Sequence, residues 1–413
     1  MAEPVEAEAA PEDAPAGEAG LAGYLRNGEL LKLYAGECTI ASRKVNQLVE
    51  RCLLEAAEAG QETFYIEAPG NHKLTFTNRL KHEDMAIFSK VFYGVSPFLC
   101  RLDVSYNLLG DVGAQQLAAA MLGPRAQSLR SLQLRSNAIG PVGCQSICDA
   151  LRSTSSLRRF DISMNPLGKE GGLMLVELLQ RSPELLELMM GDIEADIDVL
   201  VSLAAVLRRY PSQLKVLDIQ NPRISTLQED HTVHLGRMMR TNTTIMELYL
   251  GKHRMRDEGV RQLVEFLLEN QVLRVLDLRC NELGAEGAYH LGTLLAHGSA
   301  LISLNLSCNR LGEKDNVEGA RALAQGLSHN TTLKHLDLNH NDLCGPALSL
   351  LGEVAESSSL ETLRLFHNHW DQPASLMFHH MLSSRMRKSK LKADLTTSEV
   401  DKRIDISKVE MDG

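Results

Sequence analysis

The chain has 413 residues, 44% of them hydrophobic and 4% aromatic, and its 43 basic and 53 acidic residues give a formal net charge of −10. This composition predicts a folded protein with a large core and argues against a general nucleic-acid binder, which would carry a basic surface. Because no apolar run reaches roughly 18 residues and the first residues lack a secretion-signal pattern, we expect a soluble intracellular protein that contacts no membrane.

The N-terminal part of the chain precedes the regular pattern described below. Residues 1–20 hold six acidic residues, three prolines and no lysine or arginine, so we predict a disordered acidic tail. Residues 21–98 predict a helical cap, with apolar residues at helical spacing up to about residue 59. Within this cap, the alternating stretch 63–67 is a candidate degenerate first repeat, and a further helix is expected from Lys81 to Tyr93.

A repeated pattern covers most of the chain. Its clearest copy runs from Leu273 to Leu283 and reads L-x-x-L-x-L-x-x-N-x-L. The first positions of the ten copies, separated by 27 to 32 residues, are Leu99, Leu129, Leu157, Leu185, Leu214, Ile245, Leu273, Leu301, Leu333 and Leu360. This period is the signature of leucine-rich repeats, and we predict ten repeats over residues 99–384.

Each copy should form a strand followed by a helix. Alternation buries Leu276 and Leu278 and turns Asp277 to the other face, while Asn281 can hydrogen-bond the backbone where the chain leaves the strand. A single unit cannot bury its own apolar face, so the copies must stack. The predicted fold is α/β: a curved solenoid, or horseshoe, with a parallel sheet on the concave face and helices on the convex face.

Three segments depart from the regular spacing. Extra residues within 220–230 and 313–316 should lie in loops, because the stacked core tolerates no insertion. Residues 385–413 form a mixed-charge C-terminal tail that we expect to be loose. Its basic run, Arg385 to Lys392, is either a nuclear-import patch or the solvated end of the last helix.

Catalytic signatures are absent from the sequence. There is no G-x-x-x-x-G-K, H-E-x-x-H or G-x-S-x-G motif, so we expect neither an enzyme nor a cofactor. Cys280, Cys308, His340 and His367 precede successive turn asparagines and are zinc-type ligands. Four ligands in one row cannot surround an ion tetrahedrally, so we expect no metal site. A disulfide between the two cysteines is close enough in principle, but a reducing compartment argues against a persistent one.

The outward positions at the strand centres are the candidate binding residues. We assign partner binding to Asp103, Asp161, Met189, Asp218, Tyr249, Asp277 and Asp337. The aspartates form either an acidic stripe for a basic partner or a common feature of this repeat class. Copies four to six lack the turn asparagine and carry Ile193, Pro222 and His253 instead, which indicates either an adaptable interface or drift of the repeat.

The repeat length and the N-x-L-G-x-x-G turns at residues 107–113 and 281–287 resemble the ribonuclease-inhibitor-like subfamily of leucine-rich repeat proteins. Residues 228–237 and 251–259 are similar to one vertebrate member. That resemblance implies a non-enzymatic protein of nucleus, nucleolus and cytoplasm in stem and germ cells, with nucleolar protein partners, and relatives occur among ciliary proteins. Ribonuclease inhibition does not carry over, because this chain lacks the inhibitor's high cysteine content.

These observations together predict a monomeric interaction scaffold. The family resemblance implies a role in cell differentiation. Its concave sheet would bind a protein partner, with a basic partner expected from the net charge and the aspartate column. No direct contact with nucleic acid is expected. The alternative is a structural component of a ciliary or other large assembly, which would bury its convex and end surfaces instead.

Overall fold

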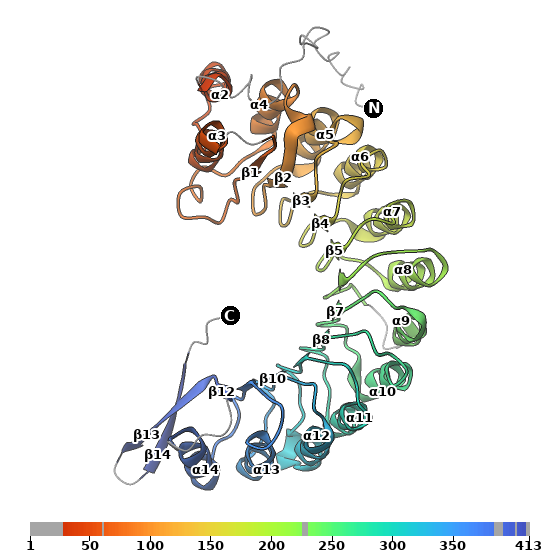
Figure 1. Ribbon diagram of the computed structural model, residues 1–413, viewed down its shortest axis with the longest axis vertical. Coiled ribbons are helices and arrows are strands. Elements are labelled where there is room, and N and C mark those ends of the chain that lie inside the picture. The colour runs from red at the N-terminus through yellow and green to blue at the C-terminus, as the bar shows by residue number, and fades with distance from the viewer. Residues whose placement is uncertain (1–27, 60–61, 225–229, 384–390, 401–402, 410–413) are drawn as a thin grey trace. The chain divides into compact units, whose positions relative to one another are not determined.

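The computed structural model describes residues 28–59, 62–224, 230–383, 391–400 and 403–409. The predicted acidic tail and most of the basic run lie outside these residues. The chain divides into two compact units, residues 1–157 and 158–413, which Figure 1 shows in red to yellow and in yellow-green to blue. This division falls inside the predicted repeat array.

The first unit contains the N-terminal cap and the first repeats. Its elements are α2 (Glu29–Ile40), α3 (Gln47–Ala59), β1 (Phe64–Glu67), α4 (His82–Phe92), η2 (Ser96–Phe98), β2 (Leu99–Asp103), α5 (Gly110–Met121), η3 (Gly123–Arg125), β3 (Ser131–Gln133) and α6 (Pro141–Leu151). Strand β1 pairs in parallel with β2, as expected of a degenerate first repeat, and β2 pairs in parallel with β3.

Aromatic side chains fill the core of the cap. The ring of Tyr34 lies 6.1 Å from that of Phe88 and 6.2 Å from that of Phe92. Phe88 and Phe92 meet edge to face at 5.0 Å, a geometry that aromatic pairs favour. These contacts join α2 to α4, so the cap has a core of its own beside the leucines of the repeats.

The second unit contains repeats three to ten. Its elements up to β8 are β4 (Arg159–Asp161), α7 (Gly168–Arg181), β5 (Glu187–Met189), α8 (Ile197–Arg209), β6 (Val216–Asp218), α9 (Asp230–Thr241), β7 (Glu247–Tyr249), α10 (Arg256–Leu267) and β8 (Val275–Asp277). The chain continues with α11 (Ala285–Ala296), β9 (Ser303–Asn305), η4 (Glu313–Asp315), α12 (Glu318–His329), β10 (His335–Asp337), α13 (Gly345–Ala355), β11 (Thr362–Arg364), α14 (Gln372–Ser383), β12 (Lys392–Ala393), β13 (Leu395–Val400) and β14 (Arg403–Lys408).

The strands β4 to β12 of this unit pair in chain order and in parallel. Figure 1 shows that they line the concave side of the unit, with the helices outside them. The register is regular, because Leu188, Leu217, Leu248 and Leu276 are successive partners. The predicted fold class, a leucine-rich-repeat solenoid with a parallel sheet inside and helices outside, is confirmed.

The inward leucines and the turn asparagines behave as predicted. Leu276 and Leu278 are completely buried. The Nδ2 of Asn281 donates to the backbone oxygen of Leu250 at 2.8 Å, and its Oδ1 accepts from the backbone nitrogens of His253 and Met255 at 2.9 and 3.2 Å. The amide therefore joins one repeat to the preceding one at the point where the strand ladder ends.

The expectation of a loose C-terminal tail is wrong for residues 391–400 and 403–409. Strand β12 extends the sheet beside β11, and β13 and β14 form an antiparallel hairpin. Leu391, Leu395 and Ile404 are buried, so the segment covers apolar surface at the end of the array. An unpaired edge strand would otherwise expose its backbone groups, and β12 pairs with that edge.

The two predicted insertions differ in how much of them is described. Glu313 to Asn316 form the short helix η4 and its exposed C-terminal residue, outside the stacked core as expected. The other insertion lies partly in residues 225–229, outside the described chain. Helix α9 begins after it at Asp230.

Candidate protein-binding face

The aspartates predicted to face a partner lie at the carboxyl ends of the strands. Asp161, Asp218 and Asp277 are only 7%, 7% and 5% exposed. In each of the five aspartates, one carboxylate oxygen accepts a hydrogen bond of 2.9 to 3.0 Å from the backbone nitrogen two residues later: Ser105, Ser163, Gln220, Arg279 and Asn339. The carboxylates fold back on their own chain and close the ends of the strands. Three of the five carboxylates are thus largely buried, while Asp103 and Asp337 are partly exposed.

The electrostatic environment of the column is also partly balanced. Burial raises the pKa of Asp277 and Asp337, against the opposing effect of backbone N–H groups and nearby guanidinium groups. The Nε of Arg279 lies 3.5 Å from Asp277 Oδ2, and the Nη1 of Arg364 lies 3.6 Å from Asp337 Oδ2. Two of the five aspartates thus have a guanidinium group nearby, which weakens the support that the column gives to a basic partner.

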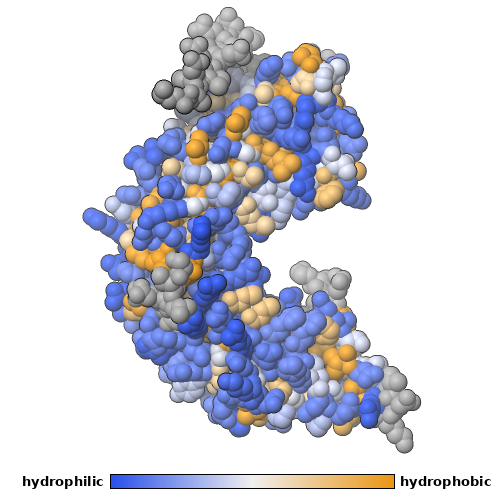
Figure 2. All heavy atoms as spheres, turned by 180° about the vertical axis from the view of Figure 1, so that it is seen from behind, coloured by the Kyte–Doolittle hydropathy of each residue, from blue (hydrophilic) through white to orange (hydrophobic). Residues whose placement is uncertain are grey.

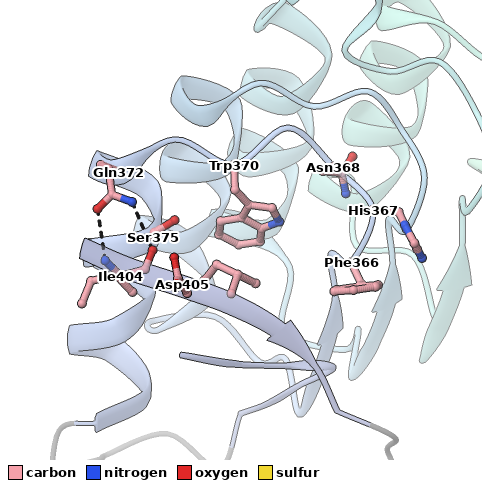
Figure 3. A pocket seen from close by; sticks show the side chains of 9 residues that line it. Phe366, His367, Asn368, Trp370, Gln372, Ser375, Ile404 and Asp405 are labelled. Atoms are coloured by element: carbon pink, nitrogen blue, oxygen red, sulfur yellow. Dashed lines mark hydrogen bonds between the residues drawn. The ribbon is translucent and has the colours of Figure 1, made fainter. Parts of the chain in front are cut away.

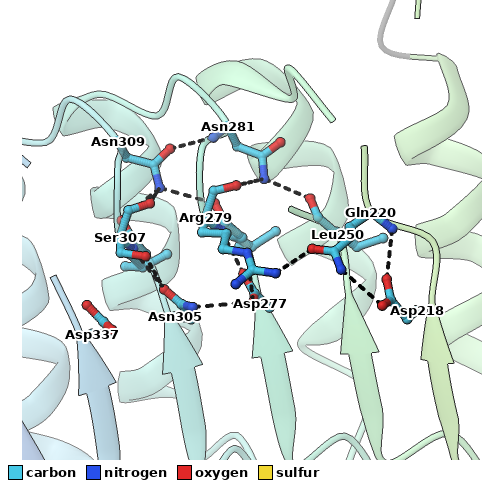
Figure 4. Close-up of polar contacts among 12 residues, drawn as sticks. Asp218, Gln220, Leu250, Asp277, Arg279, Asn281, Asn305, Ser307, Asn309 and Asp337 are labelled. Carbon is cyan, nitrogen blue, oxygen red and sulfur yellow. Dashed lines mark hydrogen bonds and ion pairs between the residues drawn. The ribbon is translucent and has the colours of Figure 1, made fainter. Parts of the chain in front are cut away.

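A polar network connects repeats five, seven and eight on the same face (Figure 4). Gln220 donates from Nε2 to Asp218 Oδ2 at 3.0 Å and accepts from the guanidinium of Arg279. Asn305 donates from Nδ2 to Asp277 Oδ2 at 3.3 Å. Gly251 lies between Gln220 and Arg279, and a Cβ there would stand 3.1 Å from Arg279 Cγ and 3.2 Å from its Nε. The glycine thus leaves room for the arginine side chain to cross the strand end.

Two rows of side chains cross β5 to β9, and the second row includes three members of this network. By register, one row is Glu187, Val216, Glu247, Val275 and Ser303, and the other is Met189, Asp218, Tyr249, Asp277 and Asn305. Acidic and apolar residues therefore alternate across adjacent strands.

The apolar members of these rows differ from the predicted anchors. Met189 is only 9% exposed, so the expectation of an exposed methionine is wrong. Tyr249 is partly exposed, and its hydroxyl donates to Glu247 Oε2 at 2.8 Å. Val216 and Val275, which the sequence analysis missed, are also partly exposed. Their signal was present in the sequence, because both stand at the outward position just before the second leucine of their repeats.

In repeat six, a histidine makes the hydrogen bond that the missing turn asparagine would make. His253 is completely buried, and its Nε2 lies 2.9 Å from the backbone oxygen of Ile219. This is the contact that Asn281 makes with Leu250 one repeat later. Burial and the nearby His231 lower the pKa of His253 to about 3, so the ring is neutral and Nε2–H donates. The histidine is thus a structural replacement for the asparagine. In repeat four, Ile193 fills the position as a buried apolar side chain.

The predicted row of zinc-type ligands consists of two cysteines followed by two histidines. Cys280 and Cys308 are free thiols, and the rings of His340 and His367 stack at 4.0 Å. Among the described residues, no group of three potential ligands could hold a metal ion.

A pocket of about 400 Å³ lies beside the last repeat (Figure 3). Its lining includes Phe366, Trp370, Gln372, Ser375, Ile404 and Asp405. Gln372 holds one wall in place, because its side chain donates to the backbone oxygen of Ile404 and accepts from the backbone nitrogen, both at 3.1 Å. This pocket could not be expected from the sequence, because the C-terminal segment that forms one wall was predicted to be loose.

The outer surface of the second unit carries apolar side chains that come from different helices. Leu173, Tyr289 and Leu376 are exposed on α7, α11 and α14. Figure 2 shows mostly hydrophilic residues over the visible surface of this unit, with the hydrophobic residues in separate patches.

Within the described chain, no helix has both the length and the apolar character needed to cross a membrane.

Comparisons with known proteins agree with this architecture. A family model described as a leucine-rich repeat matches residues 95–118, 125–148, 154–176, 269–292 and 329–352. Leucine-rich repeat-containing protein 34 of Mus musculus is 31% identical over 389 residues, which span 92% of this chain and 91% of that protein. The chain belongs to the leucine-rich repeat proteins. Members of this family generally mediate protein–protein interactions, and this relative is the vertebrate member that the sequence analysis singled out.

Two further relatives match shorter parts of the chain. Leucine-rich repeat-containing protein 34 of Homo sapiens is 38% identical over 199 residues, or 47% of this chain and 41% of that protein. The ribonuclease inhibitor of Mus musculus is 31% identical over 188 residues, which cover 45% of this chain and 40% of the inhibitor. Part of the chain is thus similar to the ribonuclease inhibitor, in agreement with the predicted resemblance to its subfamily.

Proposed function

We propose that this protein is a non-enzymatic scaffold that binds a protein partner on the concave face of β5 to β9. The observation that supports the proposal is the partly exposed group of Val216, Tyr249 and Val275. In the register of the sheet, Val216 stands between Glu187 and Glu247, and Val275 stands on the other side of Glu247. Aromatic and aliphatic anchors surrounded by polar groups are typical of protein interfaces. A partner would place an apolar side chain over the tyrosine ring and polar groups at the rim.

The rigidity of the face favours this role. The strands are in register, and hydrogen bonds hold the side chains of Asp218, Asp277 and Asn305 in the same row as Tyr249. Binding to a surface whose groups are already ordered costs little side-chain entropy. The face can therefore bind a complementary surface without rearrangement of its strands.

The sequence resemblance extends the proposal to location and partner. We propose a protein of nucleus, nucleolus and cytoplasm in stem and germ cells, where its partner would be a nucleolar protein. Imaging of the tagged full chain beside a nucleolar marker tests this part. Accumulation at cilia would instead favour the structural component of a ciliary assembly.

The binding proposal is tested by capture of partners with the tagged full chain and quantitative mass spectrometry. The double variant Tyr249→Ala/Val275→Ala should lose the partners captured by the unchanged protein, with affinity reduced about 30-fold for loss of a central aromatic anchor. The matched control is Tyr289→Ala, which removes an exposed tyrosine from the outer helix α11. Circular dichroism and urea unfolding check that each variant folds.

The two variants distinguish the proposals. If the double variant captures the same partners in the same amounts, the concave site is wrong. If Tyr289→Ala alone loses them, the convex helices bind, as expected of a component packed into a larger assembly.

A further inference from the structure

The turns that follow β6, β7 and β9 carry basic side chains along one edge of the sheet. We define this cationic edge as Arg223, Lys252, Arg254, Arg256 and Arg310. Arg223, Lys252, Arg254 and Arg310 are exposed, and the side chain of Arg223 is 77% exposed. None of these residues belongs to the apolar group of the concave face.

In the turn of repeat six, basic residues alternate with buried residues. Lys252, Arg254 and Arg256 have positive φ angles of 61°, 51° and 51°, while His253 and Met255 between them are completely buried. The backbone nitrogens of both buried residues donate to Asn281 Oδ1. Because the alternate residues are fixed inside, the three basic side chains extend outward from one short turn.

Backbone pairing continues from the strands into these turns. The nitrogen of Asn221 donates to the oxygen of Gly251 at 2.8 Å, and that of Lys252 donates to the oxygen of Arg279 at 2.9 Å. Arg223 and Arg254 thus occupy equivalent positions in adjacent repeats, where the backbones are about 5 Å apart. Like charges at such neighbouring positions repel each other. This arrangement does not serve the stability of the free protein.

Counter-charges cover only part of the edge. The Nη1 of Arg223 lies 3.6 Å from Glu194 Oε2, and the Nε of Arg256 lies 3.7 Å from Glu282 Oε2. Lys252, Arg254 and Arg310 make no ion pair with any residue in the described part of the chain. An anionic ligand would relieve the repulsion and supply the missing charges.

We propose that the cationic edge binds a carboxylate-rich segment of the same protein partner that contacts the concave face, an inference that rests on the proposed function. Tyr249 and Lys252 belong to one repeat and are separated by two residues, so one segment can contact both. Arginine side chains bind carboxylates in a bidentate geometry that strengthens such contacts. The partner is therefore acidic where it meets this edge, contrary to the basic partner expected from the sequence.

The surroundings favour a protein segment over a nucleic acid. The cations are confined to the turns after β6, β7 and β9, and the same edge of the sheet includes acidic residues: Glu194 precedes these turns, and Glu282 lies in the turn after β8. Nucleic-acid binding depends on neutralising a long series of phosphates, which requires an extended basic surface. The chain as a whole carries a net charge of −10.

The test measures binding of a fluorescein-labelled, glutamate-rich peptide to the full chain by fluorescence anisotropy. The variant Lys252→Gln/Arg254→Gln should bind the peptide about 5- to 20-fold more weakly, because two exposed charge contacts are lost. The control Arg237→Gln/Lys314→Gln removes two exposed cations elsewhere in the same unit and should bind normally. Binding to the unchanged protein should weaken as salt rises.

Several outcomes would overturn the inference. They are an absence of peptide binding, equal weakening by the edge and control variants, and tighter binding of a single-stranded RNA than of the peptide at the same edge. Capture of the cellular partner separates this inference from the proposed function. Loss of the partner by Tyr249→Ala/Val275→Ala together with full retention by the edge variant would leave the concave site standing and remove the cationic edge.

Discussion

Replacement of Asn281 by alanine should strongly destabilise the junction between repeats six and seven. The side chain is completely buried. Its loss would leave the backbone nitrogens of His253 and Met255 and the backbone oxygen of Leu250 without the partners they have at 2.9, 3.2 and 2.8 Å. Each buried polar group left unpaired costs about 1 to 3 kcal/mol, with partial relaxation expected among neighbours. We therefore expect Asn281→Ala to lower the free energy of unfolding by about 3 to 5 kcal/mol.

The assay combines urea unfolding with hydrogen exchange. The backbone amides of His253 and Met255 should exchange faster in the variant, because Asn281 Oδ1 no longer accepts from them. Glu282→Ala is the matched control: its partly exposed side chain makes only a 3.7 Å ion pair with Arg256, and its loss should cost under about 0.5 kcal/mol. A cost for Asn281→Ala below about 1 kcal/mol, or unchanged exchange at both amides, would refute the proposed role of the asparagine.

Three further outcomes are expected. Leu276→Ala should lower the free energy of unfolding by about 2 to 5 kcal/mol, because the side chain is completely buried. Asp277→Asn should lower it by less, because the asparagine keeps an acceptor for the backbone nitrogen of Arg279. Equal urea midpoints for the two variants would contradict this. His253 has a pKa of about 3 when folded and about 6.5 when unfolded, so its contribution to stability should be complete above pH 6.5 and fall as pH drops toward 3. His253→Asn should reduce that loss, and identical pH profiles would argue against it. Gln372→Ala should accelerate amide exchange in β14, because both contacts with Ile404 disappear; unchanged exchange would show that other contacts hold the hairpin.

Periodicity was sufficient to predict the interior of the repeats. The leucine spacing determines which side chains must be buried, and Leu276 and Leu278 are buried in the structure. The turn asparagine could be predicted for a related reason, since a chain leaving a strand needs partners for its backbone groups and an amide offers both a donor and an acceptor. Both predictions depend on local geometry that recurs in every repeat.

The state of the outward side chains could not be predicted in the same way. Alternation places Asp277 on the concave side, but it does not determine whether the carboxylate faces solvent or folds back to the nitrogen of Arg279, as it does at 2.9 Å. The role of His253 depends on the backbone oxygen of Ile219, which is 34 residues earlier in the chain. Burial of Ile404 likewise requires the end of the repeat array, which composition alone does not reveal.

The net charge of the chain is a poor guide to the charge of a partner that binds the proposed surfaces. Six of the acidic residues lie in residues 1–20, and the Debye length at physiological ionic strength is only about 8 Å. A partner segment therefore responds mainly to the charges it closely approaches. On the concave face those include Asp277, whose carboxylate is largely buried and lies 3.5 Å from a guanidinium nitrogen of Arg279. At the edge they are Lys252 and Arg254, which are exposed and make no ion pair with any described residue. The same acidic chain can consequently present a locally cationic surface, and the charge of its partner must be inferred from side-chain contacts.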